Sequence, residues 1–287
     1  MTSISVAAPD WLAQRASADD RSRSVGLAEQ LARMLPSGPL VVHDLGAGTG
    51  AMTRWLAPRL GGPQRWVLRD GDEGILNHVD LSETTDAHGN PVVAEATVED
   101  LTSLPLDAFH GASAVTASAL LDVITVEEAA NIVAACVHAH TPALFSLTVT
   151  GGVRIEPHLP RTSGIEGDLA AAFNDHQRRE TAGRRLLGPH AVPLVAALFE
   201  AAGWSVRRAS TPWRLDASDG PLIAQWLDGW LTAAVEQRPD LARPADELRR
   251  ARLAQNAVGR LRVTVSHEDL LAWPPQPPGT GGAYGGG

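Results

Sequence analysis

The stretch VVHDLGAGTGAMTRWL, residues 41–56, passes from an apolar run to a helical pattern. Three glycines separate the two parts, at Gly46, Gly48 and Gly50. A buried strand, a glycine-rich turn and a helix start together leave free backbone N–H groups at the carboxyl edge of a parallel sheet, where ligands bind. The stretch therefore predicts a strand, turn and helix that hold a ligand.

Charge indicates which ligand this turn accepts. The spacing is Gly-x-Gly-x-Gly rather than the dinucleotide pattern G-x-G-x-x-G, although Ala51 can end that pattern, so spacing alone does not exclude NAD. Asp44, the last residue of the predicted strand, would repel a pyrophosphate by about 4 kcal/mol at 4 Å and an effective dielectric of 20. The same carboxylate would attract an ammonium or sulfonium group. A cationic ligand with an adenosine end therefore fits better than a dinucleotide.

A second carboxylate, Asp70, follows Gly50 by twenty residues at the end of the next predicted strand. A carboxylate in this place can accept two hydrogen bonds from ribose hydroxyls. In the alternative reading Asp72 makes that contact and Asp70 caps the following helix. The position of Asp70 at a rigid strand end favours Asp70 as the ribose contact.

Short apolar runs alternate with longer segments of helical period, which is typical of a parallel sheet covered by helices. Strands are predicted near 40–44, 65–69, 91–97, 112–116, 143–149, 204–211 and 260–267, and helices near 23–35, 51–60, 72–79, 125–139 and 189–202. Two helical insertions, at 164–181 and about 218–259, stand outside the alternation. The pattern predicts a doubly wound α/β fold.

The stretch VVHDLGAGTG resembles the first motif of the class I S-adenosylmethionine-dependent methyltransferases, and Asp70 with Leu76 resembles their second. The resemblance covers residues 38–150 and extends to the last two strands through their order. It implies a Rossmann-like sheet of seven mostly parallel strands with an antiparallel final strand, and S-adenosyl-L-methionine as cofactor. It also implies an N-terminal helical cap over 1–37, a methyltransferase domain over 38–273 with insertions about 152–188 and 212–259, and a disordered Pro/Gly tail over 274–287.

The resemblance implies where the cofactor binds. Asp44 would serve the methionine amino group, the turn residues Gly46, Ala47, Gly48 and Gly50 would hold the methionine portion, and Asp70 would hold the ribose. The family commonly places an aspartate on the adenine amino group, but here the stretch is EATVEDLTSLP, residues 95–105. Thr97 takes that place, while the Val98 backbone and Asp100 are alternatives.

Two further contacts follow from the resemblance. The fourth motif corresponds to residues 115–122, VTASALLD, where Thr116 would lie beneath the methyl group. An N-terminal helix often closes over the cofactor in this family, and DWLAQRASADDRSR can supply one. Arg15 would then meet the methionine carboxylate, or alternatively remain a solvated arginine.

Methyl transfer is an in-line displacement on an activated sulfonium, so the protein contributes alignment and, for a hydroxyl or acidic carbon acceptor, a base. Asp122 is one candidate catalytic residue, with a helix cap as its alternative role. His176 is the other, because it shares a helical face with Ile165, Leu169 and Phe173; packing is its alternative role.

Two other segments have alternative readings. The run TGGVRIEPHLP after the fifth strand is either an arm lining an acceptor pocket or, by default, an exposed hairpin. Trp226 and Trp230 lie one turn apart on the buried face of the second insertion. Core packing is favoured for both tryptophans over an aromatic substrate wall.

The net charge and the residue composition limit the kinds of partner that the protein is expected to bind. The formal charge of −9 disfavours nonspecific binding of nucleic acid, and RRETAGRR, residues 178–185, reads as a solvated helix end rather than a phosphate site. One cysteine, Cys136, excludes a disulfide framework, and no histidine pair has metal-ligand spacing. With no membrane-spanning run or signal peptide, we expect a cytoplasmic enzyme that binds no metal, nucleic acid or membrane.

The hypothesis is an S-adenosyl-L-methionine-dependent methyltransferase acting on a small molecule. A cofactor-binding relative without catalysis is the alternative from another class. A nucleic-acid methyltransferase is disfavoured because TASALLD does not resemble the N/D/S-P-P-Y/F motif. An NAD-dependent oxidoreductase is disfavoured by the glycine spacing and by Asp44.

Overall fold

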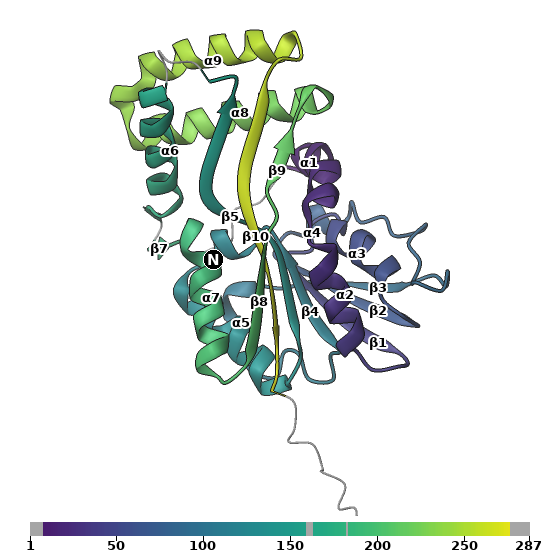
Figure 1. Ribbon diagram of the computed structural model, residues 1–287. Coiled ribbons are helices and arrows are strands. Elements are labelled where there is room, and N and C mark those ends of the chain that lie inside the picture. Colours follow the sequence, from purple (N-terminus) through teal and green to yellow (C-terminus); the bar gives the residue numbers. More distant parts are fainter. Residues whose placement is uncertain (1–7, 159–162, 182, 276–287) are drawn as a thin grey trace, which may run out of the picture.

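A computed structural model describes residues 8–158, 163–181 and 183–275 (Figure 1). The tail predicted from Pro274 lies outside these ranges from residue 276 onward. None of the helices within the described ranges is both long and apolar enough to cross a bilayer.

The centre of the molecule is one mixed sheet. Its strands are β1 (Leu40–Leu45), β2 (Gln64–Asp70), β3 (Val93–Val98), β4 (Ala114–Ser118), β5 (Ala143–Glu156), β8 (Ser205–Ser210), β9 (Trp213–Leu215) and β10 (Arg262–Trp273). The order is β3-β2-β1-β4-β5-β10-β8, with β9 also paired to β10. The first five strands pair in parallel, and β10 is antiparallel to β5, β8 and β9. The predicted doubly wound fold with an antiparallel final strand is confirmed, while β9 was not predicted.

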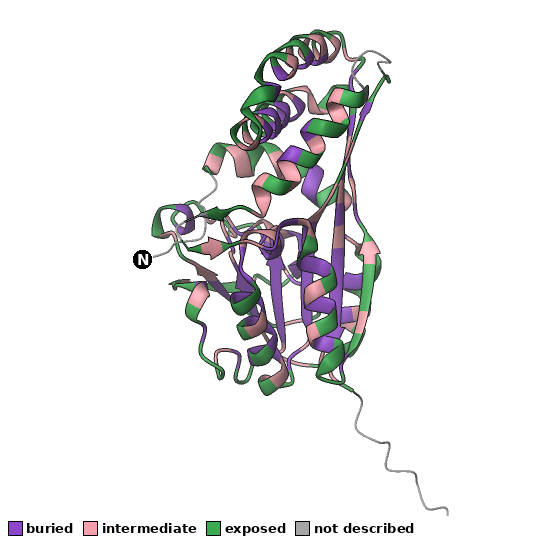
Figure 2. Ribbon diagram, turned by 90° about the vertical axis from the view of Figure 1, so that its left-hand side faces the viewer, coloured by how far each residue is buried: buried purple, intermediate pink, exposed green. Residues whose placement is uncertain are grey.

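Helices cover both faces of this sheet. They are α1 (Pro9–Ser22), α2 (Val25–Met34), α3 (Ala51–Leu56), α4 (Glu73–Leu76), α5 (Val126–Ala139), α6 (Ser163–Gln177), α7 (Ala191–Ala201), α8 (Gly220–Gln237) and α9 (Ala242–Ala257). Residues of α5 and α7 form one apolar core with β4 and β5, and residues of α2 and α3 form another with β1 and β2. Cys136 is buried in the first core. Figure 2 shows the buried strands between these layers.

The helices α6, α8 and α9 lie beyond the carboxyl end of the parallel strands, on a ribbon formed by the outer halves of β5 and β10 (Figure 1). We call this ribbon with β9 and the three helices the helical cap, residues 149–156, 163–177, 213–257 and 261–266. Its core contains Leu169, Leu227 and Leu231, with Ile155 from β5. The default prediction of an exposed hairpin after the fifth strand is therefore wrong, because β5 continues into this core.

Two bulges redirect β5 as it leaves the sheet. Register shifts fall between Glu268 and Leu270 and between Val265 and His267 of β10, so β5 carries extra residues against it. Leu147 in the first bulge has φ +57°, a left-handed conformation that is unfavourable for a branched side chain. Its N–H is held by the buried carboxylate of Asp269 at 2.8 Å. This contact fixes the direction in which β5 enters the cap.

Candidate functional site

The glycine turn between β1 and α3 has the backbone that its sequence predicts. Gly46, Gly48 and Gly50 have φ values of +60°, +55° and +80°. Side chains also approach closely, since a Cβ on Gly46 would lie 3.1 Å from Leu120 and one on Gly48 would lie 3.3 Å from Leu12. Glycine is therefore required at these positions by conformation and by space.

Asp70 is tied directly to this turn. The Gly48 N–H donates to Asp70 Oδ2 at 2.9 Å, and the Asp72 N–H donates to Asp70 Oδ1 at 3.1 Å. Asp72 caps α4 by accepting from the N–H groups of Gly74 and Ile75. The alternative in which Asp70 caps the helix and Asp72 faces the ligand is therefore wrong. The structure brings Asp70 and the glycine turn together.

Asp44 lies beneath the turn rather than facing its open side. The carboxylate is 1% exposed and accepts hydrogen bonds from Thr116 Oγ1 at 2.8 Å and Thr53 Oγ1 at 3.2 Å. Burial raises the pKa of Asp44 to about 7, against the opposing effect of the two hydroxyls and Arg23. Asp44 is thus enclosed by protein, and its contact with a ligand stays a prediction.

Thr116 is also buried, with its hydroxyl donating to Asp44. This contact makes Thr116 a residue that positions Asp44, and its place beneath the methyl group stays a prediction. Ala47 is buried in the turn, where its N–H donates to the Arg69 carbonyl.

The end of β3 adjoins Asp70, because Asp70 and Val98 are register partners. Thr97 is half-buried, and Val98 is an apolar side chain that is 56% exposed. Asp100 accepts from the N–H and hydroxyl of Thr102, which occupies one of its oxygens. Val98 therefore supplies an apolar surface beside Asp70.

Helix α1 covers the turn and contributes two arginines. Arg15 is ion-paired with Asp19 at 2.8 Å, and its guanidinium lies 4.9 Å from the ring centroid of Trp213. The reading of Arg15 as a solvated side chain is therefore wrong. Arg23 is 3% exposed and donates to Ser118 at the end of β4, while its Nε has no hydrogen-bond partner within the described ranges.

A cavity of about 380 Å³ opens between the carboxyl ends of β4 and β5, helix α1 and the helical cap. Its lining residues Ala119 and Asp122 flank Leu120, the side chain that packs against Gly46 of the turn. Aromatic side chains dominate its walls: Trp11, Phe173, Trp213, Trp226 and Trp230. The rings of Trp226 and Trp230 stack at 5.5 Å with an interplanar angle of 15°. The prediction that Trp226 and Trp230 pack in a core is confirmed, and both side chains also line the cavity.

Asp122 lies at the base of this cavity, on the turn that follows β4. Its Oδ1 is buried and has no hydrogen-bond partner in the part of the chain that the structure describes. Burial raises the pKa of Asp122 to about 6, while the charge of Arg15 acts in the opposite direction. Asp122 precedes α5 without capping it, because Thr125 caps that helix.

His176 lies outside the cavity. Ile165, Leu169 and Phe173 pack in the cap core, as the helical spacing predicts, but His176 pairs with Glu236 of α8 at 2.8 Å. The structure does not bring His176 together with Asp122, and the expectation that it serves as a catalytic residue is corrected on that ground.

The sequence analysis missed Arg23, Trp11, Trp213 and His267, of which the last three line the cavity. His267 is buried on β10, on the inward side shared with Val263 and Val265. A histidine at an inward position of an alternating strand is a signal that could have marked it. Nothing in the local sequence around Trp11 could have placed it beside Trp213.

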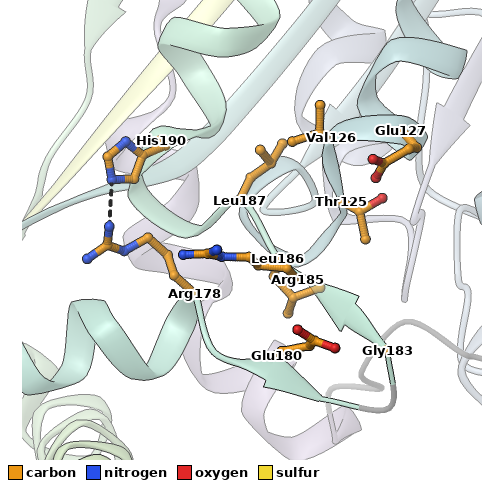
Figure 3. A pocket seen from close by; sticks show the side chains of 10 residues that line it. All are labelled: Thr125, Val126, Glu127, Arg178, Glu180, Gly183, Arg185, Leu186, Leu187 and His190. Carbon is orange, nitrogen blue, oxygen red and sulfur yellow. Dashed lines mark hydrogen bonds between the residues drawn. The ribbon is translucent and has the colours of Figure 1, made fainter.

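Figure 3 shows a second cavity, of about 500 Å³, between the start of α5 and a hairpin formed by β6 (Glu180–Thr181) and β7 (Arg184–Arg185). Arg178 donates to His190 at 3.1 Å, and Glu127 and Glu180 line the same cavity. Arg184 pairs with Glu128 instead of being solvated. Charges of both signs line the cavity, which disfavours a phosphate site.

Comparison with known proteins supports the fold. No family model matches the sequence, and no curated protein matches it. The structure is similar to that of a candidate type II methyltransferase from Anaeromyxobacter dehalogenans, with TM-score 0.51, 14% identity, and coverage of 88% of this chain and 97% of that chain. It is also similar to an S-adenosylmethionine-dependent methyltransferase from Geobacter sulfurreducens in complex with S-adenosyl-L-homocysteine, with TM-score 0.43, 15% identity, and coverage of 95% and 100%. The chain therefore has the Rossmann-like methyltransferase fold.

Proposed function

We propose that this protein transfers a methyl group from S-adenosyl-L-methionine to a small-molecule acceptor. One observation carries the proposal: the glycine turn joined to Asp70 lies next to an aromatic cavity whose base is formed by the turn after β4. This arrangement supports a nucleoside site and an acceptor cavity next to each other at one edge of the sheet. In a relative that only binds the cofactor, the carboxylate oxygen of Asp122 that has no hydrogen-bond partner among the described residues would have no role.

The residues at the turn fit the proposed cofactor. Asp70 is a ribose acceptor held rigidly by two backbone N–H groups. Arg23 offers a buried guanidinium with an unpartnered Nε, suited to the methionine carboxylate. Val98 provides an apolar wall for the adenine, and the buried Asp44 favours positive charge above the turn. When bound, the cofactor would supply an activated methyl group, so the protein needs only to orient the acceptor and take its proton.

Cofactor choice can be tested by calorimetric titration with S-adenosyl-L-homocysteine and with NAD. We expect the first to bind and the second to bind at least 100-fold more weakly, because the carboxylate of Asp44 disfavours a pyrophosphate on the glycine turn. Replacement Asp70→Ala is expected to weaken S-adenosyl-L-homocysteine binding by about tenfold or more, since it removes a charge-assisted hydrogen-bond acceptor.

Glu73→Ala is the matched control, because Glu73 is an exposed carboxylate three residues along the chain. It is expected to bind like the unmodified protein. Comparable binding of NAD, or equal effects of the two substitutions, would contradict the proposed function.

A further inference from the structure

The walls of the aromatic cavity suit a planar ring. Trp226 and Trp230 stack in parallel, and Trp11 and Trp213 lie 6.3 Å apart at 58°. Such faces interact favourably with another ring in an offset or edge-on arrangement. A volume of about 380 Å³ is near the lower end of ligand cavities, which accommodates a compact molecule of one or two rings.

Arg15 already occupies the tryptophan faces that a cationic guest would use. It lies 4.9 Å from the centroid of Trp213 and 6.0 Å from that of Trp11. Asp19 fixes it there, by pairing with Arg15 at 2.8 Å and accepting from Trp213 Nε1 at 2.9 Å. An ammonium guest would be attracted by Asp122 but would have to compete with a resident guanidinium for these two rings.

Besides Arg15, the cavity lining offers hydrogen-bond acceptors at Asp122 and His267 and one buried donor without a partner among the described residues, Trp230 Nε1. Asp122 Oδ1 has no donor among the described residues. His267 Nδ1 lies 3.0 Å from the Val265 carbonyl, so this nitrogen carries the proton and Nε2 is left as an acceptor. Burial and the charge of Arg15 lower the pKa of His267 to about 4, so the ring is neutral at pH 7. A guest with a permanent negative charge would meet the carboxylate of Asp122, whereas a hydroxyl would satisfy it.

We propose that the methyl acceptor is a neutral aromatic hydroxyl compound, a phenol, whose ring lies against Trp226 and Trp230 and whose O–H is donated to Asp122. The inference rests on the proposed function and names its acceptor class. In the reaction, a lone pair of the phenol oxygen forms the new bond to the methyl carbon as the methyl–sulfur bond breaks. The bonding pair stays on sulfur, and the O–H proton passes to Asp122. A sulfonium and a carboxylate thereby become a neutral thioether and a neutral acid.

The acceptor class can be tested by tryptophan fluorescence and calorimetry, with S-adenosyl-L-homocysteine present, using four probes that share one ring system. The probes are 2-naphthol, 2-methoxynaphthalene, 2-naphthoate and 2-naphthylmethylammonium. We expect 2-naphthol to bind at least tenfold more tightly than each of the others, and Trp226→Leu to weaken its binding at least tenfold. Trp226→Phe is expected to restore most of that loss, which separates ring contact from folding.

The substitution Asp122→Asn tests whether Asp122 accepts the proton of the phenol. We expect turnover of 2-naphthol with S-adenosyl-L-methionine to fall by about 100-fold or more, while binding of 2-naphthol changes by less than about fivefold. In the unmodified protein, with S-adenosyl-L-methionine saturating, kcat/KM for 2-naphthol should fall as the pH drops below about 6, where Asp122 becomes protonated. The variant should lack this part of the dependence, whereas the titration of Asp44 is common to both proteins. The exposed Asp107→Asn serves as the matched control and should retain both turnover and pH profile.

The outcomes separate this inference from the proposed function. If S-adenosyl-L-homocysteine binds but the four probes bind equally, or the ammonium or carboxylate binds best, the phenol inference is wrong and the proposed function stands. Retention of full turnover by Asp122→Asn removes the base from the inference. Absence of S-adenosyl-L-homocysteine binding overturns both.

Discussion

Replacing Asp269 by alanine is expected to lower the free energy of unfolding by about 3–5 kcal/mol, since each buried donor left without a partner costs about 1–3 kcal/mol. The carboxylate is 1% exposed and accepts three hydrogen bonds, from Ser24 N at 2.8 Å, Leu147 N at 2.8 Å and Thr211 Oγ1 at 2.7 Å. These donors belong to the junction of α1 and α2, the bulge of β5, and the segment between β8 and β9. One side chain therefore joins three parts of the chain.

Urea denaturation followed by circular dichroism measures this change. Glu268→Ala is the matched control, because its neighbouring carboxylate makes only a surface ion pair with Arg208 at 3.5 Å, and it should cost less than about 1 kcal/mol. Thr211→Val removes one of the three donors together with its bond and should fall between the two. A loss below 1 kcal/mol for Asp269→Ala would show that Asp269 does not hold the bulge.

Asp44→Asn is expected to have the opposite effect on stability. Burial raises the pKa of Asp44 from 3.8 to about 7, so the folded chain binds more protons than the unfolded chain between these values. The free energy of unfolding therefore falls as the pH rises from about 4 to 7, and the penalty is complete above 7. At 1.36 kcal/mol per pKa unit the penalty is at most about 4 kcal/mol. Asparagine removes it, and Thr116 can donate to the His43 carbonyl instead, at 3.3 Å.

The difference in free energy of unfolding between Asp44→Asn and the unmodified protein should thus be small at pH 4.5 and reach about 2–4 kcal/mol at pH 8. Because His43, Asp122 and His267 titrate in both proteins, their contributions cancel in this difference. The variant should also bind S-adenosyl-L-methionine at least tenfold more weakly, since the charge that favours the sulfonium is gone. A difference that does not depend on pH would contradict the raised pKa. Unchanged binding would contradict the electrostatic role of Asp44.

The inner part of the sheet could be predicted because its parallel strands are short apolar runs bounded by turn residues, as in LVVHDL ahead of Gly46. The edge strand β3, VAEATV, is mostly exposed and carries a weaker signal. The extension of β5 to Glu156 could not be predicted from the local sequence. The outer half of this strand packs only against elements of the helical cap that come later in the chain. The left-handed conformation of Leu147 has no local signal, because it depends on Asp269, more than a hundred residues away. Tertiary contacts, rather than local preference, determine both features.

The candidate site could likewise be predicted only where it depends on local structure. Asp70 and the glycines follow from strand ends and from backbone conformation, which are local properties. The side-chain direction of Asp44 depends on Thr53 and Thr116, which pack beneath it from α3 and β4. His176 illustrates the limit of a helical-face pattern, because the pattern placed it beside Phe173 but could not show that Glu236 would pair with it.

Strands β5 and β10 run from the sheet into the helical cap. As a result, the residues proposed to bind the methyl donor and most of the tryptophans of the cavity come from different segments of the chain. The residues proposed to hold the methyl donor lie before Asp122, whereas the tryptophans Trp213, Trp226 and Trp230 come from a later segment carried on the ribbon. The two crossings of the chain between sheet and cap, near Gly151 and His267, therefore enclose most of the aromatic wall of the cavity together with α7 and β8, while Trp11 and Asp122 lie outside them.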